Sequence, residues 1–244
     1  MMSTFVLVHG AYHGAWCWSR LTPLLESQGH RVLAPDLPGH GEDQTPLSDV
    51  TLSNYTAAIC QVVASADEPV ILVGHSMAGA VVAGAAERMA SRVRQLVFLT
   101  AYIPGDGQSV AQMVRADTRI SIPIERVGAA GVPCLRMAPD VLRRHFYHDA
   151  TDDDFVWAAA RVRQQAIAPF AARVQLSAAQ FGAVPRAYIH CRHDRAIGLA
   201  LQRQMALAAG CSPMLYLKSG HSPFVTQPAA LCAMLVELAE DHAI

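Results

Sequence analysis

A run of apolar residues that ends at a serine among glycines constrains this chain more than any other stretch. Val70-Ile-Leu-Val73 leads into Gly74-His-Ser-Met-Ala-Gly79, and small residues with helical spacing follow. This order is typical of a buried strand, a sharp turn and a helix, with Ser76 at the tip of the turn. The stretch follows the pattern G-x-S-x-G, except that Ala78 stands at the last glycine position and Gly79 comes one residue later. We expect the turn to strain the backbone of Ser76 and to hold its hydroxyl above the sheet, where it can act as a nucleophile.

Apolar runs alternate with helical spacing through the first hundred residues and again near the end of the chain. Besides the strand before Ser76, the pattern predicts strands at 4–8, 31–35, 93–100, 186–191 and 214–218. It predicts helices at 15–27, 52–64, from the turn to about 90, at 199–209 and at 228–240. Such alternation is typical of a parallel sheet that is covered by helices on both faces. We therefore predict an α/β fold with about six mostly parallel strands.

The middle of the chain breaks this alternation. Glycine and proline recur there, and only two helical stretches are expected, at 141–148 and from 152 to about 168. The segment follows the carboxyl end of a strand, where ligands bind in α/β sheets. We therefore predict a helical lid of residues 104–183, inserted after the fourth strand into a core of residues 1–103 and 184–244.

A serine nucleophile needs a base, and the base needs an acid to orient it. In a fold of this kind the acid follows the serine along the chain and the histidine follows the acid. His221 comes directly after the strand at 214–218, and Asp194 comes directly after the strand at 186–191. We predict Ser76, Asp194 and His221 as the catalytic residues. Asp106, which follows the strand at 93–100, is the alternative acid.

Two backbone N–H groups are expected to bind the negative oxygen that forms when the serine attacks a carbonyl. One belongs to Met77, the residue after the nucleophile, because this position faces the reacting carbon. The other is expected from Ala11, in the glycine-rich turn after the first strand. Gly10 lets the chain fold tightly beside Ser76 in that turn.

The overall charge argues against several kinds of partner. The chain has 19 basic and 20 acidic residues, so neither nucleic acid nor an anionic membrane surface is favoured. No apolar run approaches the ~18 residues of a membrane span. Met1-Met-Ser-Thr4 lacks the basic region of a signal peptide, and the six scattered cysteines include no C-x-x-C pair. We expect a cytoplasmic protein with reduced thiols; its oligomeric state is left open.

No motif indicates a cofactor or a metal. The chain lacks G-x-x-x-x-G-K-[ST], and the glycines after the first strand do not form G-x-G-x-x-G. His190 and His193 have the spacing of a metal-binding pair, but no cysteine or carboxylate pattern accompanies them. We therefore expect neither a cofactor nor a metal site.

Several motifs together resemble the α/β-hydrolase superfamily, and more narrowly its branch of plant methylesterases and hydroxynitrile lyases with their bacterial esterase relatives. They are the stretches 5–18, 29–41 and 74–79. The stretches 186–197 and 221–224 look more like bacterial esterases, some of which hydrolyse pyrethroid-type esters. The resemblance covers residues 5–102 and 184 to the end, whereas the predicted lid resembles the plant members poorly.

The resemblance implies the α/β-hydrolase fold and assigns the same roles as above: Ser76, Asp194 and His221 in the triad, Ala11 and Met77 in the oxyanion hole. Lyases of this branch typically carry threonine where this chain has Gly10, and lysine where it has Ser222. The threonine hydroxyl holds the cyanohydrin and the lysine charge stabilises the departing cyanide. The resemblance therefore favours ester hydrolysis.

We expect a serine esterase that hydrolyses a small to medium hydrophobic or aryl carboxylic ester through an acyl-enzyme. The alternatives are cyanohydrin cleavage, hydrolysis of a lactone, thioester or amide, and a ligand receptor on a hydrolase fold. The substrate itself is left open, because selectivity depends on the shape of the pocket. We expect that pocket to include Gly10, Tyr12, Tyr102, Phe146 and Trp157.

Overall fold

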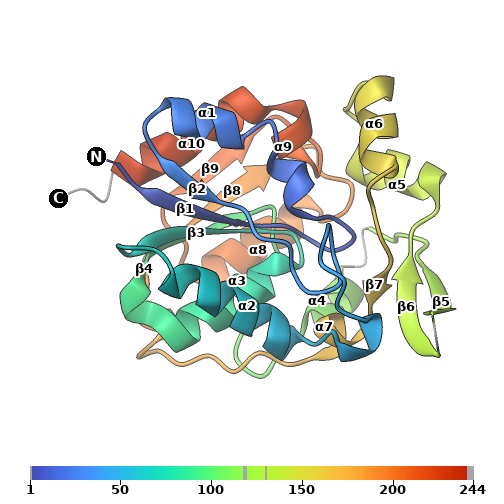
Figure 1. Cartoon of the computed structure of the whole chain (residues 1–244), viewed down its shortest axis with the longest axis horizontal. Coiled ribbons are helices and arrows are strands. Elements are labelled where there is room, and N and C mark those ends of the chain that lie inside the picture. The colour runs from blue at the N-terminus through green and yellow to red at the C-terminus, as the bar shows by residue number, and fades with distance from the viewer. Residues whose placement is uncertain (1, 118–119, 130, 241–244) are drawn as a thin grey trace.

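The computed structural model describes residues 2–117, 120–129 and 131–240 (Figure 1). The ranges predicted for the core and the lid also include residues 1, 118–119, 130 and 241–244, which lie outside the described residues.

A six-stranded sheet forms the centre of the molecule, in the order β2-β1-β3-β4-β8-β9. Every neighbouring pair in it is parallel, so the predicted class of fold is confirmed. β1 and β3 are buried throughout, which explains their unbroken apolar sequences. The strands are β1 (Thr4–Val8), β2 (Arg31–Leu33), β3 (Val70–His75), β4 (Val93–Leu99), β8 (Arg186–Cys191) and β9 (Met214–Leu217).

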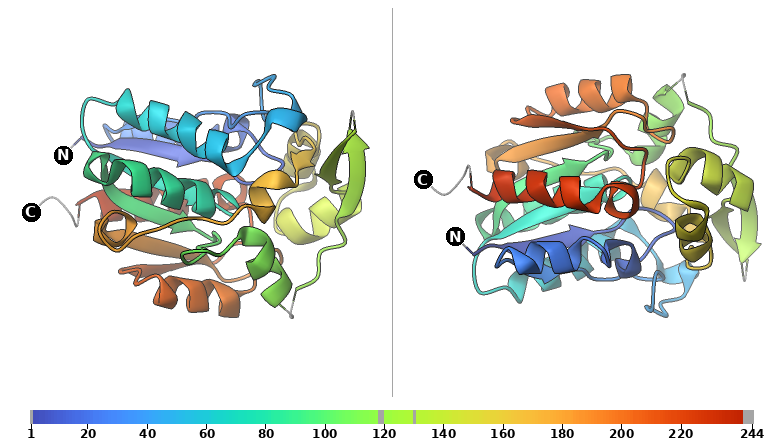
Figure 2. Two further views of the ribbon diagram at one scale, coloured as in Figure 1. Left: turned by 90° about the horizontal axis from the view of Figure 1, so that it is seen from below. Right: turned by 90° about the horizontal axis from the view of Figure 1, so that it is seen from above.

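Helices cover both faces of this sheet, as Figures 1 and 2 show. On one face lie α1 (Thr22–Ser27) and α10 (Pro228–Glu240), and on the other lie α2 (Leu52–Ala64) and α3 (Ala78–Met89). α8 (Leu199–Ala208) packs against β8, and the short α9 (Pro223–Thr226) precedes α10. This layering leaves the carboxyl ends of the strands uncovered by these helices.

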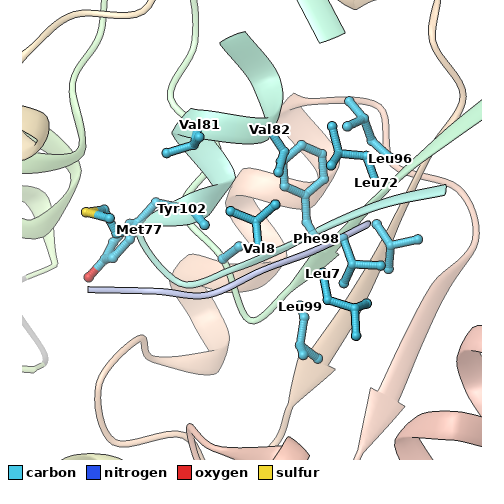
Figure 3. Packing of buried hydrophobic residues seen from close by; sticks show 14 of the residues in the cluster. Leu7, Val8, Leu72, Met77, Val81, Val82, Leu96, Phe98, Leu99 and Tyr102 are labelled. Atoms are coloured by element: carbon cyan, nitrogen blue, oxygen red, sulfur yellow. The ribbon is translucent and has the colours of Figure 1, made fainter. Parts of the chain in front are cut away.

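Successive side chains of the central strands point to opposite faces of the sheet. Figure 3 shows Leu96 and Phe98 turned toward Val82 of α3, whereas Leu7 and Leu99 point to the other side. All five side chains are fully buried. At about 1.5–3 kcal/mol for each buried apolar side chain, this packing holds α3 firmly against the sheet.

The helix predicted at 15–27 is two separate pieces. A 3-10 turn, η1 (Ala15–Trp18), comes first, and α1 begins only at Thr22. The carboxylate of Asp36 accepts a hydrogen bond from the Ala15 N–H at 2.6 Å, which holds the first piece against the loop after β2. Pro23 lies in the first turn of α1, a position where the missing N–H of proline costs nothing.

Between β4 and β8, residues 104–183 form a unit of mixed structure that we call the middle segment. Its helices are α4 (Val110–Ala116), α5 (Pro139–Phe146), α6 (Asp152–Ala159) and α7 (Ala168–Ala171). It also contains an antiparallel sheet of β5 (Glu125–Ala129), β6 (Val132–Arg136) and β7 (Gln165–Ala166). Figures 1 and 2 show α5, α6, β5 and β6 beyond the carboxyl ends of the central strands.

The prediction of a helical lid therefore needs correction, because the segment also contains strands. The helix predicted from 152 to about 168 ends at Ala159, and its last part is strand β7. β7 pairs with β6, about thirty residues earlier in the chain, so no local pattern signals it. Pro133 lies within β6, and proline in a short run argues against a strand when only the sequence is read.

Candidate active site

The turn between β3 and α3 holds Ser76 in a left-handed conformation, with φ +55°. Non-glycine residues rarely adopt this conformation, so the strain expected at Ser76 is present. The Ser76 carbonyl accepts from the Tyr102 N–H at 3.0 Å, which ties the turn to the end of β4. A Cβ atom at Gly79 would lie 2.0 Å from the Tyr102 carbonyl oxygen, so this close approach requires glycine.

Three buried side chains form a continuous row above this turn. His221 Nε2 lies 3.1 Å from Ser76 Oγ, and His221 Nδ1 lies 2.7 Å from Asp194 Oδ2. When the proton is on Nδ1, the imidazole donates to the carboxylate and Nε2 is free to accept the proton of the serine hydroxyl. The serine follows β3, the aspartate follows β8 and the histidine follows β9, so the parallel sheet brings the three predicted residues together.

Asp194 has hydrogen-bond partners in addition to His221. Its Oδ1 accepts from the backbone N–H groups of Ala196 at 2.6 Å and Ile197 at 3.0 Å. The Thr100 hydroxyl donates to Oδ2, the oxygen that also faces His221. These contacts fix the plane of the carboxylate, and with it the imidazole.

Thr100 was not predicted as part of the site. It follows β4, whose neighbour in the sheet is β8, and its φ is +38°. Nothing in the sequence around Thr100 predicts a contact with Asp194. The contact arises because β4 and β8 are adjacent strands in the sheet. The alternative acid, Asp106, accepts from the Leu176 N–H at 2.9 Å, and the structure does not bring it to His221.

The loop after β1 is fixed by a buried histidine. The Leu37 N–H donates to His9 Nε2 at 3.0 Å, so the proton of His9 is on Nδ1, which donates to the Gly10 carbonyl at 2.8 Å. Burial lowers the pKa of His9 to about 4, which keeps this imidazole neutral. The N–H and C=O of a trans peptide point in opposite directions, so the direction of the Ala11 N–H is fixed as well.

The two backbone groups predicted for the oxyanion hole are the N–H groups of Ala11 and Met77. Across the described residues, neither the Ala11 N–H nor the Met77 N–H donates a hydrogen bond. The loop and the turn are in close contact, because a Cβ atom at Gly10 would lie 2.9 Å from Ser76 Cβ. Both N–H groups are therefore near Ser76 and available to a ligand.

His75 contacts both the backbone and the ring of His221. Its Nε2 donates to the His221 carbonyl at 2.9 Å, and the two rings lie 4.7 Å apart. Burial is the main cause that lowers the pKa of His75 well below its ordinary value. His75 therefore remains a neutral donor and is not itself a candidate for the base.

A cavity of about 320 Å³ opens at Ser76. Of the predicted pocket residues, Tyr12, Tyr102 and Phe146 line it. The middle segment supplies most of the remaining wall, which includes Ile120, Ile122, Ile124, Leu135, Ile167 and Phe170. Among the described residues, those with charged side chains at this cavity are Arg115, Asp117 and Arg126. The wall next to Ser76 is therefore mainly apolar.

Two of the predicted pocket residues lie elsewhere. Gly10 is beneath the cavity, packed against His75 and Ser76. Trp157 packs edge-to-face on Trp16, with ring centroids 5.3 Å apart, and the Arg161 guanidinium lies 4.9 Å from its ring. The expected lining is corrected at Trp157, because α6 turns this side chain toward η1.

Within residues 2–117, 120–129 and 131–240, no group of three or more histidine, cysteine, aspartate or glutamate side chains has an arrangement that could hold a metal ion. In the same ranges, no helix combines the length and the apolar character that crossing a membrane requires.

Comparison with known proteins agrees with this fold and site. Residues 5–234 match the alpha/beta hydrolase family. The chain belongs to the alpha/beta hydrolase family. Methylesterase 7 of Arabidopsis thaliana is 33% identical to this hydrolase over 260 residues, covering 98% of this chain and 97% of the relative. Salicylic acid-binding protein 2 of Nicotiana tabacum is 32% identical and covers the same shares.

Solved structures of other hydrolases superpose closely on this one. Polyneuridine aldehyde esterase superposes with a TM-score of 0.90 at 27% identity, covering 98% of this chain and all of the other. The pyrethroid hydrolase PytH gives a TM-score of 0.85 at 27% identity, covering 98% of each chain. The predicted resemblance to the methylesterase-like branch and to pyrethroid-type esterases is therefore confirmed.

Proposed function

We propose that this alpha/beta hydrolase is a serine esterase that hydrolyses carboxylic esters. The observation that carries the proposal is the row of Ser76, His221 and Asp194, spaced at 3.1 and 2.7 Å, at the base of an apolar cavity. The similar proteins include methylesterases, an aldehyde esterase and a pyrethroid hydrolase, which supports the same chemistry.

The first half of the reaction forms an acyl-enzyme. Ser76 Oγ attacks the ester carbonyl while His221 Nε2 takes its proton, and Asp194 stabilises the imidazolium that results. The N–H groups of Ala11 and Met77 bind the negative oxygen of the tetrahedral intermediate. A donor of this kind contributes roughly 2.7–4 kcal/mol of transition-state stabilisation. The intermediate collapses when His221 returns the proton to the leaving alcohol.

The second half releases the acid. A water molecule takes the place of the alcohol, and His221 removes its proton as the water attacks the acyl carbonyl. The same two N–H groups bind the second negative oxygen. When this intermediate collapses, Ser76 leaves as the protonated hydroxyl and the carboxylic acid departs, so the enzyme returns to its starting state.

The cavity supports a hydrophobic or aryl ester as the substrate. Aromatic rings of Tyr12, Tyr102 and Phe146 surround the nucleophile, and aliphatic side chains form the outer wall. A site of this size and polarity is typical of a small apolar ligand. Because residues 104–183 supply most of this wall, we propose that they act as the lid that selects the substrate.

Position 10 favours hydrolysis over cyanohydrin cleavage. A Cβ atom there would lie 2.9 Å from both His75 Nδ1 and Ser76 Cβ, which leaves no room for the threonine of the lyases. Ser222, the residue after the proposed base, is buried and carries no charge that could stabilise departing cyanide.

We also propose a cytoplasmic location. The structure supports it through the six cysteines, which are all free thiols. Proteins with many unpaired cysteines are typical of reducing compartments.

Substitution of the nucleophile tests the proposed function. Ser76→Ala should lower the hydrolysis of p-nitrophenyl butyrate by at least about 1,000-fold, because loss of the nucleophile removes the acyl-enzyme route. Ser48→Ala, at a surface serine far along the chain from the turn, is the matched control and should keep full activity. Circular dichroism checks that both variants fold. Substantial activity in folded Ser76→Ala would overturn the proposal.

A further inference from the structure

A side chain of the middle segment is hydrogen-bonded to the backbone next to His221. Asp149, in the turn between α5 and α6, accepts from the Gly220 N–H at 2.6 Å through Oδ2. The same oxygen lies 3.3 Å from the Thr226 hydroxyl, which can donate to it, and 3.4 Å from the Ser219 hydroxyl, which in turn lies 3.0 Å from Thr226 Oγ1. One carboxylate therefore bridges residues on both sides of His221.

We propose that Asp149 is a positioning residue, which pins the two ends of the segment 219–226 and thereby sets the place of the His221 imidazole over Ser76. The inference rests on the proposed function, since it assigns His221 the role of base.

The contact between the turn and this segment is tight. A Cβ atom at Gly220 would lie 2.5 Å from Asp149 Oδ1 and 2.7 Å from His148 Cε1. A side chain at position 220 would have to displace this carboxylate, so the glycine allows the backbone to come this near to it. The short hydrogen bond to a charged acceptor fixes the peptide plane just before His221.

The turn that carries Asp149 is itself well supported. Arg143 Nη1 donates to the carbonyls of Tyr147 at 2.8 Å and Ala150 at 3.0 Å, on both sides of Asp149. The Tyr147 hydroxyl donates to His13 Nε2 at 2.6 Å, which joins the turn to the loop after β1. The carboxylate is therefore presented from a fixed backbone, although Asp149 itself is exposed.

Phe146, the last residue of α5 before this turn, contacts the ring of His221 directly. The Phe146 ring packs edge-on against the imidazole, with centroids 4.6 Å apart and an angle of 78°. Phe146 limits where the ring can go, and Asp149 limits where its backbone can go. Since misplacing a reacting group by ~1 Å can cost ~100-fold in rate, both constraints matter for catalysis.

Three variants test this role. Asp149→Ala should lower kcat about tenfold and leave KM within about twofold, because the base is displaced while the cavity is intact. Asp149→Asn should keep kcat within about threefold of wild type, because the amide oxygen still accepts from the Gly220 N–H. Asp153→Ala removes another exposed carboxylate of the middle segment and should change neither constant.

The measurement separates positioning from general stability. kcat is expressed per active site, titrated with a fluorophosphonate that reacts with Ser76, so that unfolded protein does not count. Equal values for Asp149→Ala and Asp153→Ala would overturn the proposal. So would a rise in KM with kcat unchanged, or an Asp149→Asn variant as slow as Asp149→Ala.

Hydrogen exchange at the Gly220 amide gives a second readout that needs no substrate. Asp149→Ala should speed this exchange at least about tenfold, and Asp149→Asn should change it little. If the wild-type protein has no ester turnover, the proposed function fails. Unchanged exchange in Asp149→Ala shows separately that the carboxylate does not pin the segment.

Discussion

Ser76, Asp194 and His221 meet because each stands after a different strand of the same parallel sheet. The three residues predicted from chain order are the three that the structure brings within hydrogen-bond distance. Their chemistry and their places after strands were readable from the sequence. Thr100 and Asp149 were not, because their roles depend on which elements become neighbours in space.

The two possible acids can be separated at this scale. Asp194→Asn should lower kcat by roughly 1,000-fold or more, because an amide stabilises the wrong tautomer of His221. Asp106→Asn should leave kcat near wild type, since the Asp106 carboxylate accepts from the Leu176 N–H and does not face His221. Steady-state hydrolysis of p-nitrophenyl butyrate measures both. A larger loss in Asp106→Asn would reverse the assignment.

The turn between β3 and α3 is the element on which the site depends. The strained backbone conformation of Ser76 is maintained only because the chain packs closely around it, with Gly79 against the Tyr102 carbonyl. The strand, the turn and the helix were predictable, because each has a local pattern in the sequence. The strands of the middle segment were not, because β6 and β7 pair across about thirty residues.

A methyl group at this turn should therefore be costly. Gly79→Ala would place Cβ 2.0 Å from a backbone oxygen that cannot move alone, so we expect a loss of about 3 kcal/mol in the free energy of unfolding. Gly128→Ala is the control, because no atom of the described residues lies within 4 Å of a Cβ at that glycine. Urea unfolding measures both variants. Equal stabilities would show that the turn relaxes at little cost.

At the scale of the whole molecule, several histidines are buried as neutral groups beneath and around the site. Burial lowers the pKa of His9 to about 4 and those of His13 and His40 to about 3. In the unfolded chain the same groups titrate near 6.5. Below that pH the unfolded chain binds protons that the folded protein excludes, so acid favours unfolding.

The free energy of unfolding should accordingly be highest above pH 6.5 and fall as the pH drops toward 4. At about 1.4 kcal/mol for each pKa unit, each of these histidines contributes a loss of about 2 kcal/mol at pH 5. Urea unfolding at pH 7.5 and pH 5.0 measures the difference. His193→Asn, at an exposed histidine, should leave it unchanged. Equal stability at the two pH values would contradict the burial of neutral histidines.

The sequence by itself determined the parallel sheet, the strained serine turn and the order of the proposed nucleophile, acid and base, because these depend on local patterns and on strand order. Only the tertiary structure decided what surrounds them. It turned Trp157 away from the cavity toward Trp16, and it placed Asp149 against Gly220. Contacts of this kind join residues far apart in the chain, and their energies arise only when the elements have packed.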